Sequence, residues 1–245
     1  MEKCIKKIGI IGAMDSEISV LRSIMKENGS LKQTEAGNCT CNEGVINGVS
    51  AVVVKSGVGK GNAALCAQRL ILQFGVDAVI NTGIAGAMGG NLCIFDMAVS
   101  TDAVYHDMDA VEFGYKPTEI PQMKVSAFPA DERLIKAAKS AFEKTNKSGE
   151  RKIVAGRVAT GDQFVAEKAV KNHIKEICSP VCVEMEGAAI AHTCYVNCIP
   201  YVILRCISDM ADDTVKATYS FNEETAAEES SKVVIEMLAE LSCGN

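Results

Sequence analysis

Short apolar runs alternate with amphipathic stretches along the chain, and most runs end in small or polar residues. A short apolar run is typical of a strand buried on both faces, whereas apolar residues spaced three or four apart indicate a helix that covers a sheet. The runs that predict strands are 7–14, 77–83, 96–104, 153–160, 181–183 and 200–209. The stretches that predict helices are 18–25, 63–72, 130–146, 167–177, 187–191 and a final one through 233–238. Strands that alternate with helices predict an α/β fold.

Two segments add detail to this pattern. Residues 39–55 alternate around Asn47-Gly48, which predicts a β-hairpin. The small residues of 84–90 predict that the strand 77–83 breaks into a loop there. Such residues would let a flat ligand approach the backbone, but an ordinary loop explains them equally well.

Length and composition place the chain among ordinary globular proteins. It has 245 residues, of which 48% are hydrophobic, so residues 1–245 are predicted to form a single domain. A net charge of −6 argues against nucleic acid as a partner. The apolar run 8–14 is too short for a signal peptide or a membrane span. Eleven cysteines, an odd number scattered through the predicted elements, indicate free thiols and a cytoplasmic protein.

Several segments contain ligand-binding residue types without the matching motif. Gly9 and Gly12 do not form a dinucleotide fingerprint. The glycine-rich loop 56–62 opens a helix and can hold an anion, but it departs from the Walker pattern. Neither residues 106–109 nor the paired cysteines have the spacing of a metal-ligand set. We therefore expect neither a metal nor a cofactor.

Charged residues stand within or just after several of the predicted strands. Glu184 and Glu186 fall where the strand 181–183 gives way to a helix, and a ligand-facing glutamate is favoured there over a simple helix cap. Asp209 ends the strand 200–209. Glu17 follows the first strand and either lies on the surface or points back over the end of that strand. Arg205 stands inside an apolar strand and therefore needs a carboxylate or a ligand as partner.

Three of these acids, Glu17, Glu186 and Asp209, are predicted to meet at one edge of the sheet, where open α/β sheets bind ligands. Separated acids can do separate work. In glycosidic hydrolysis one carboxyl protonates the leaving group while another activates water. A third carboxylate can bind the hydroxyl groups of the sugar, for example a ribose.

Seven segments, in the same order and across almost the whole chain, resemble the 5′-methylthioadenosine/S-adenosylhomocysteine nucleosidases of the purine nucleoside phosphorylase superfamily. They are IGIIGAMDSE at 8–17, KSGVGK at 55–60, NTGIAG at 81–86, YHD at 105–107, TGDQFV at 160–165, VEMEGAAIA at 183–191 and RCISDMAD at 205–212. The resemblance implies a three-layer α/β/α sandwich with a central mixed β-sheet. It also implies hydrolysis of adenine nucleosides by water, in methionine salvage and in removal of S-adenosylhomocysteine.

The resemblance implies a role for each matching residue. Glu17 matches the base for the attacking water, Asp209 the acid that protonates adenine at N7, and Glu186 the residue that binds the ribose hydroxyls. The other matches are Met185 on the sugar, Phe164 stacked on adenine, Val165 and Gly86 as backbone contacts, Arg205 near the water and Phe221 beside the 5′-thio group.

A further segment implies a second subunit. Phe113, Tyr115 and Pro121 resemble the part that a neighbouring subunit contributes to the 5′-thio pocket, so a homodimer is expected. One position departs from a common form of the family motif. Ile84 stands where many relatives have a serine beside the acid that matches Asp209, so a hydroxyl at this position cannot orient Asp209.

Three alternatives compete with this interpretation. A phosphorylase would need cations for phosphate, and only Lys60 is basic near the glycine turns. A hydrolase that removes adenine from aminodeoxyfutalosine would use the same acids, and one enzyme could accept all of these substrates. A non-catalytic adenosine-binding protein predicts loss of Glu17 or Asp209, and both are present.

Overall fold

The computed structural model describes residues 5–37, 39–89, 91–212 and 215–242, except for the side chains of 215–221. The strands are β1 (Lys7–Gly12), β2 (Lys32–Ala36), β3 (Cys39–Ile46), β4 (Val49–Lys55), β5 (Ala78–Ala87), β6 (Met97–Tyr105), β7 (Phe128–Pro129), β8 (Ile153–Thr160), β9 (Cys182–Glu184) and β10 (Tyr201–Asp209). The helices are α1 (Asp15–Glu27), α2 (Lys60–Phe74), α3 (Glu132–Thr145), α4 (Lys168–Cys178), α5 (Gly187–Val196), α6 (Val215–Leu241) and the 3₁₀ turn η1 (Val111–Phe113).

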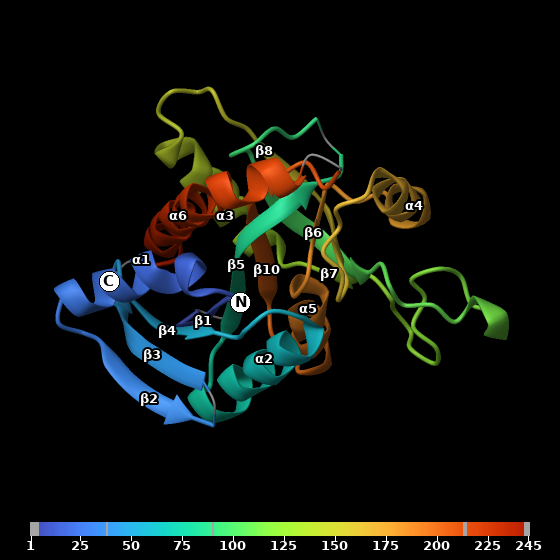
Figure 1. Cartoon of the computed structure of the whole chain (residues 1–245). Helices are drawn as coiled ribbons and strands as arrows, with labels where there is room; N and C mark the ends of the chain where they lie inside the picture. Colours follow the sequence, from blue (N-terminus) through green and yellow to red (C-terminus); the bar gives the residue numbers. More distant parts are fainter. Residues whose placement is uncertain (1–4, 38, 90, 213–214, 243–245) are drawn as a thin grey trace.

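All of these strands belong to one mixed sheet (Figure 1). Its order is β10-β6-β8-β9-β5-β1-β4-β3-β2, with β7 beside β6. The pairs β1–β4, β1–β5 and β5–β10 are parallel, whereas β5–β9 and β6–β10 are antiparallel. A further pairing of β10 with β5 closes β5, β10, β6, β8 and β9 into a ring. The predicted α/β fold with a central mixed sheet is confirmed.

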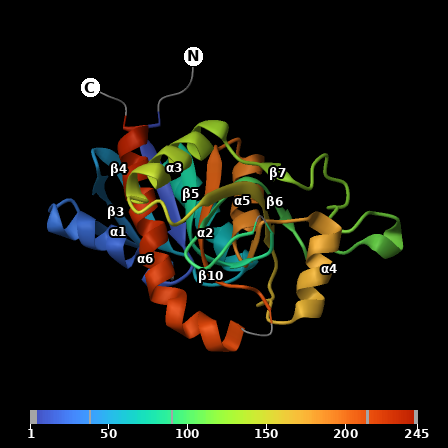
Figure 2. The same cartoon turned by 90° about the horizontal axis from the view of Figure 1, so that it is seen from above.

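Helices cover both faces of the sheet (Figures 1 and 2). α1, α3 and α6 pack on one face and share one apolar cluster with inward residues such as Ile10, Ile80 and Leu204. α2 and α5 pack side by side on the other face over a second cluster that includes Val79 and Ile203. Because successive strand residues point to opposite faces, neighbours in one strand serve different clusters. This explains the uninterrupted apolar runs in the sequence.

Residues 107–127 form a lobe that extends away from the sheet beside β7, green in Figures 1 and 2. The lobe contains η1 and little other regular structure. In the described part of the chain, no helix combines the length and the apolar composition needed to cross a bilayer.

The hairpin prediction is confirmed, because β3 and β4 pair antiparallel around Asn47 (φ 48°) and Gly48 (φ 80°). Two predicted boundaries are wrong. β5 does not break after Gly83 but continues to Ala87, since its small residues are buried between β10 and β9. α6 begins at Val215, before Phe221, although the apolar pattern that predicted it becomes regular only later.

Candidate active site

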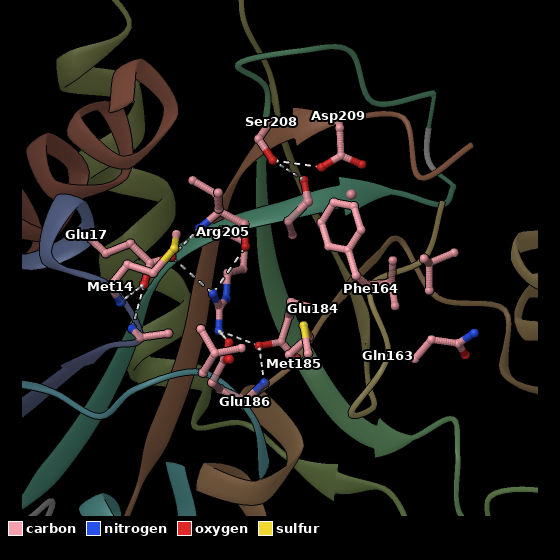
Figure 3. Close-up of a pocket in the computed structure, with 17 residues that line it drawn as sticks. Met14, Glu17, Gln163, Phe164, Glu184, Met185, Glu186, Arg205, Ser208 and Asp209 are labelled. Atoms are coloured by element: carbon pink, nitrogen blue, oxygen red, sulfur yellow. Dashed lines mark hydrogen bonds and ion pairs between the residues drawn. The ribbon is translucent and has the colours of Figure 1, made fainter. Parts of the chain in front are cut away.

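A cavity lies where β1, β5, β8, β9 and β10 end (Figure 3). It has about 550 Å³ of empty space, including solvent at its mouth. Its lining residues are Ala13, Met14, Glu17, Val58, Ile84, Ala85, Gly86, Gln163, Phe164, Val165, Val183, Glu184, Met185, Glu186, Arg205, Ser208 and Asp209. The structure thus brings together eight of the residues singled out in the sequence: Glu17, Gly86, Phe164, Val165, Met185, Glu186, Arg205 and Asp209.

Glu17 points back over the end of β1 rather than out to solvent, which decides between the two orientations that the sequence left open. Its side chain is 1% exposed. One carboxylate oxygen accepts hydrogen bonds from the backbone N–H groups of Ala13 (2.6 Å) and Met14 (3.1 Å), and the other accepts from Ile84 N–H (3.0 Å). Burial raises the pKa of Glu17, although Arg205 and these hydrogen bonds oppose the shift.

Gly83 makes room for this arrangement in the middle of β5. A β-carbon at position 83 would lie 2.1 Å from a carboxylate oxygen of Glu17 and 2.6 Å from Nη1 of Arg205. Neither neighbour is free to move, because both are buried and held by hydrogen bonds. Only glycine therefore fits at this position.

Arg205 is a buried cation at the centre of a cluster of acids (Figure 3). Its guanidinium forms an ion pair with Glu184 and lies 3.2 Å from Glu186 and 3.7 Å from Glu17. It also donates to the side-chain oxygen of Asn81 (2.7 Å) and to the carbonyl of Ile84 (3.2 Å). The prediction that this arginine has a carboxylate partner is confirmed.

Glu184 is a site residue to which the sequence gave no role. It pairs with Arg205 and accepts hydrogen bonds from Thr160 Oγ1, from Glu186 N–H (3.1 Å) and from Gly187 N–H (2.7 Å). These contacts fix the turn between β9 and α5. The only signal in the sequence was the second acid beside Glu186.

Glu186 stands at the N-terminal cap of α5 and faces the cavity. One carboxylate oxygen accepts a hydrogen bond from Gly59 N–H (2.9 Å) and the other from Arg205 (3.2 Å). Burial raises its pKa, and Arg205 opposes that shift more strongly than Glu184 adds to it. Three glutamates, Glu17, Glu184 and Glu186, thus share one guanidinium.

Asp209 ends β10 on the other side of the cavity from Glu17 (Figure 3). Its oxygens accept hydrogen bonds from Ser208 Oγ (2.9 Å) and Ala211 N–H (2.8 Å). Burial raises the pKa of Asp209, although these two hydrogen bonds oppose the shift. The hydroxyl that contacts Asp209 therefore comes from Ser208, whereas Ile84 contributes its backbone to Glu17 and Arg205. Gly86 is needed here, because a β-carbon would lie 2.9 Å from Asp209 Oδ1.

Phe164 lies in the segment after β8, and its ring faces the cavity near Asp209 (Figure 3). It is 50% exposed although it is aromatic, so it is not a core residue. Val165 is buried beside it. Together they form an apolar wall that suits a flat aromatic ligand.

The remaining predicted residues do not reach this cavity within one chain. Phe113 is 85% exposed in the lobe, and neither Tyr115 nor Pro121 lines the cavity. The side chain of Phe221 lies outside the described residues. Within the described ranges, no group of His, Cys, Asp and Glu side chains could hold a metal ion.

Comparison with known proteins shows the family to which the chain belongs. The model of the Phosphorylase superfamily matches residues 7–239. The 5′-methylthioadenosine/S-adenosylhomocysteine nucleosidase of Staphylococcus carnosus (strain TM300) is 38% identical over 235 residues, which are 96% of this chain and 100% of that protein. The chain belongs to this nucleosidase family. The resemblance seen in the sequence is confirmed, and the family is one of N-glycosyl hydrolases.

Solved structures of the family have the same fold. The Neisseria meningitidis nucleosidase in complex with methylthio-immucillin-A has a TM-score of 0.90 and 36% identity, over 96% of this chain and 100% of that one. The futalosine hydrolase of Helicobacter pylori strain 26695 is also similar, with a TM-score of 0.89 and 31% identity over 96% of this chain and 98% of that one.

Proposed function

We propose that the enzyme hydrolyses the N-glycosidic bond of 5′-methylthioadenosine, S-adenosylhomocysteine and 5′-deoxyadenosine. The products are adenine and the 5-substituted ribose. The observation that carries this proposal is the placement of two buried acids with raised pKa values, Glu17 and Asp209, on opposite sides of one cavity. Such a pair can act on both ends of a bond that breaks.

Asp209 protonates N7 of adenine as the bond breaks. Adenine is a poor leaving group as an anion, so this proton is needed. The raised pKa of Asp209 favours the protonated acid. The ring of Phe164 stacks on adenine, and the backbones of Val165 and Gly86 contact its edge.

Glu17 accepts a proton from the attacking water. Three backbone N–H groups hold its carboxylate in place, so the base is already oriented before substrate binds. Arg205 lies beside it, 3.7 Å away, and can hold the water as well.

Glu186 binds the ribose hydroxyls, and Met185 packs on the sugar. The sugar passes through an oxocarbenium-like transition state, which carries positive charge. Because Glu17, Glu184 and Glu186 share one Arg205, the site can stabilise that charge more than it stabilises the neutral substrate.

The charges in the cavity favour water over phosphate as the nucleophile. Arg205 is the only Lys or Arg among the described residues that line the cavity, and three carboxylates surround it. A phosphate at this position would meet acids rather than free cations. Lys60, the basic candidate from the sequence, does not line the cavity.

Aminodeoxyfutalosine is a second candidate substrate. The similarity to the Helicobacter pylori futalosine hydrolase supports it, because that enzyme has the same fold at 31% identity. The S. carnosus nucleosidase is more similar, at 38%. We therefore rank the thioadenosines first.

We also propose a homodimer in which the partner's lobe completes the 5′-thio pocket. Phe113, in the lobe, is 85% exposed rather than packed on its own chain. The outer face of α2 and α5 exposes Leu65 (70%), Leu72 (71%) and Val196. An apolar surface of this kind is typical of a subunit contact.

Residues 1–245 are proposed to be one domain, which the single sheet supports. We place the enzyme in the cytoplasm. Nine cysteines in the described part of the chain are free, as expected in a reducing compartment. There it would serve methionine salvage and remove S-adenosylhomocysteine.

The test is adenine release by purified enzyme from each nucleoside, measured with and without phosphate. We expect adenine release that does not depend on phosphate. The rates of release from the three nucleosides then rank the substrates. Release that requires phosphate would make the enzyme a phosphorylase. Tight nucleoside binding without release would instead support a binding protein.

A further inference from the structure

Lys60, the first residue of α2, forms a small ion cluster near the mouth of the cavity, outside its lining. Its ammonium lies 2.5 Å from Asp107 Oδ2 and 3.7 Å from Asp162 Oδ2. The side chains of Lys60 and Asp107 are about a quarter exposed, at 26% and 28%, whereas that of Asp162 is half-exposed. We call these three residues the Lys60 clasp.

Backbone hydrogen bonds reinforce the clasp. Lys60 N–H donates to Asp162 Oδ1 (2.8 Å), and Asp162 N–H donates to Asp107 Oδ2 (2.9 Å). Gly59 precedes Lys60 with φ 97°, and a β-carbon there would lie 3.1 Å from Asp162 Oδ1. Each acid thus contacts both the ammonium and a backbone N–H, which fixes its position more firmly than an isolated surface ion pair would.

The clasp joins three segments that lie far apart in the sequence. Lys60 ends the glycine turn, whose Gly59 N–H holds Glu186 (2.9 Å). Asp162 begins the segment that carries Phe164 two residues later. Asp107 begins the lobe. One ammonium therefore links the ribose-binding acid, the adenine-stacking ring and the base of the lobe.

We propose that Lys60 is a positioning residue, which sets nucleoside affinity by holding Glu186 and Phe164 at their working separation. This inference rests on the proposed function, because it assigns Glu186 to ribose and Phe164 to adenine. The clasp does not touch the reacting atoms. Glu17 and Asp209 are held by contacts outside the clasp, and Arg205 is held by Asn81 and Glu184 as well as by Glu186.

The test is Lys60→Met, which keeps the length of the side chain and removes its charge. We expect KM for 5′-methylthioadenosine to rise about tenfold and kcat to fall by a smaller factor of about three, because a displaced Glu186 weakens ribose binding and also stabilises less of the charge that develops on the sugar. Lys60→Arg should restore most of the affinity. The matched control is Lys144→Met, which removes a lysine paired with Glu236 and Glu240 far from the cavity.

The contacts within the Lys60 clasp also predict that substitutions of its residues have non-additive effects on KM. Asp162→Asn should raise KM in the wild-type background and add little in the Lys60→Met background, because both changes open the same contact. Additive effects, an unchanged KM, or a fall in kcat alone would overturn the proposal. A loss of folded enzyme lowers the apparent kcat without changing KM. The change in KM therefore distinguishes a positioning role of Lys60 from a purely structural one.

Adenine binding by calorimetry gives a readout that does not require turnover. If wild-type enzyme binds adenine but releases none from nucleosides, the proposed function fails. Weaker adenine binding by Lys60→Met would still support the clasp, and unchanged binding would overturn it. Wild-type protein that neither binds nor releases adenine would overturn both proposals.

Discussion

Buried acids outnumber buried cations among the residues that line the cavity. Glu17, Glu184, Glu186 and Asp209 face a single cation, Arg205. Burying charge is costly, and a raised carboxyl pKa is one way in which a protein lowers that cost. The same imbalance prepares the site for a ligand that becomes positively charged as it reacts.

Asp209→Asn is expected to bind nucleoside and to lose most turnover. Asparagine can still accept from Ala211 N–H and contact Ser208, so the local structure should persist. It has no proton to transfer, so kcat should fall by about 10²–10⁴. Steady-state kinetics and a binding assay on one preparation test this. Wild-type turnover in the variant would remove Asp209 from the mechanism.

The same substitution should change how stability depends on pH. Because burial raises the pKa of Asp209 above its ordinary value of 3.8, its ionisation favours the unfolded state. Its contribution to stability is therefore complete below that value and is lost as pH rises through the raised pKa. Asparagine does not ionise, so Tm of the variant relative to wild type should be higher at about pH 8 than at about pH 4. A difference that is constant with pH would contradict the shift.

Glu184→Gln tests the acid to which the sequence analysis assigned no specific role. It removes the charge nearest Arg205 from a side chain that also holds the turn before α5. We expect a loss of about 1–3 kcal/mol in the free energy of unfolding, because glutamine weakens the charge-assisted hydrogen bonds that Glu184 accepts from Arg205, Thr160 and backbone N–H groups. Denaturant unfolding measures it, with Glu43→Gln as control, since Glu43 contacts lysines only at 4.0 Å. Equal stability of the two variants would show that the pair is dispensable.

Sequence reasoning found Glu186 and Asp209 because each acid follows an apolar run. It left Glu17 undecided, since the turn after β1 allows both orientations, and one of them is fixed by hydrogen bonds from the backbone N–H groups of Ala13, Met14 and Ile84. It gave Glu184 no role because that side chain is satisfied inside the protein, by Thr160, Arg205 and backbone N–H groups. A contact between residues of distant strands produces no pattern within a short stretch of the sequence.

At the scale of elements, β5 carries the tightest constraint in the site. Gly83→Ala would place a methyl group within 2.1 Å of the Glu17 carboxylate. We expect a loss of about 1–3 kcal/mol in stability from overpacking. We also expect kcat to fall by about 100-fold, because Glu17 or Arg205 must move. Thermal unfolding and steady-state kinetics check both effects.

Gly61→Ala is the control for this prediction. Gly61 lies in α2, and a β-carbon there would meet nothing within 4 Å. Alanine should stabilise the helix by up to about 1 kcal/mol. If Gly83→Ala and Gly61→Ala had similar stability and similar kcat, the structure around position 83 would accommodate a methyl group without loss of stability or activity.

The boundaries of elements were predicted less well than their existence. β6 and β8 lie within two residues of the ranges predicted from apolar runs, and β3 and β4 lie within the alternating stretch 39–55 that predicted the hairpin. β5 was expected to stop at Gly83, because glycine and alanine are typical of loops. Its last residues are strand because β10 and β9 supply partners on both sides, which no local pattern shows.

At the scale of the whole molecule, the dimer proposal makes a testable statement about the α2–α5 face. Replacing Leu65 and Leu72 together by glutamate should produce monomers, since both side chains are about 70% exposed and apolar. KM for 5′-methylthioadenosine should rise while adenine binding is retained, because only the 5′-thio pocket needs the partner. Analytical ultracentrifugation and kinetics measure these effects.

Val45→Glu is the control for the dimer prediction, because Val45 is exposed in β3 on the other side of the molecule from the lobe. It should leave association unchanged. If the double variant remains dimeric, the subunit contact lies elsewhere. If wild type is monomeric with full activity, one chain completes its own pocket.

The last strand of the chain, β10, lies between β5 and β6 and closes the ring. A ribosome makes the chain from its N-terminus, so both neighbouring edges stay unpaired until nearly all of the sheet has been synthesised. Arg205 arrives with this strand, and until then Glu17, Glu184 and Glu186 have no guanidinium to balance them. Completion of the charge cluster is therefore coupled to insertion of β10 into the sheet.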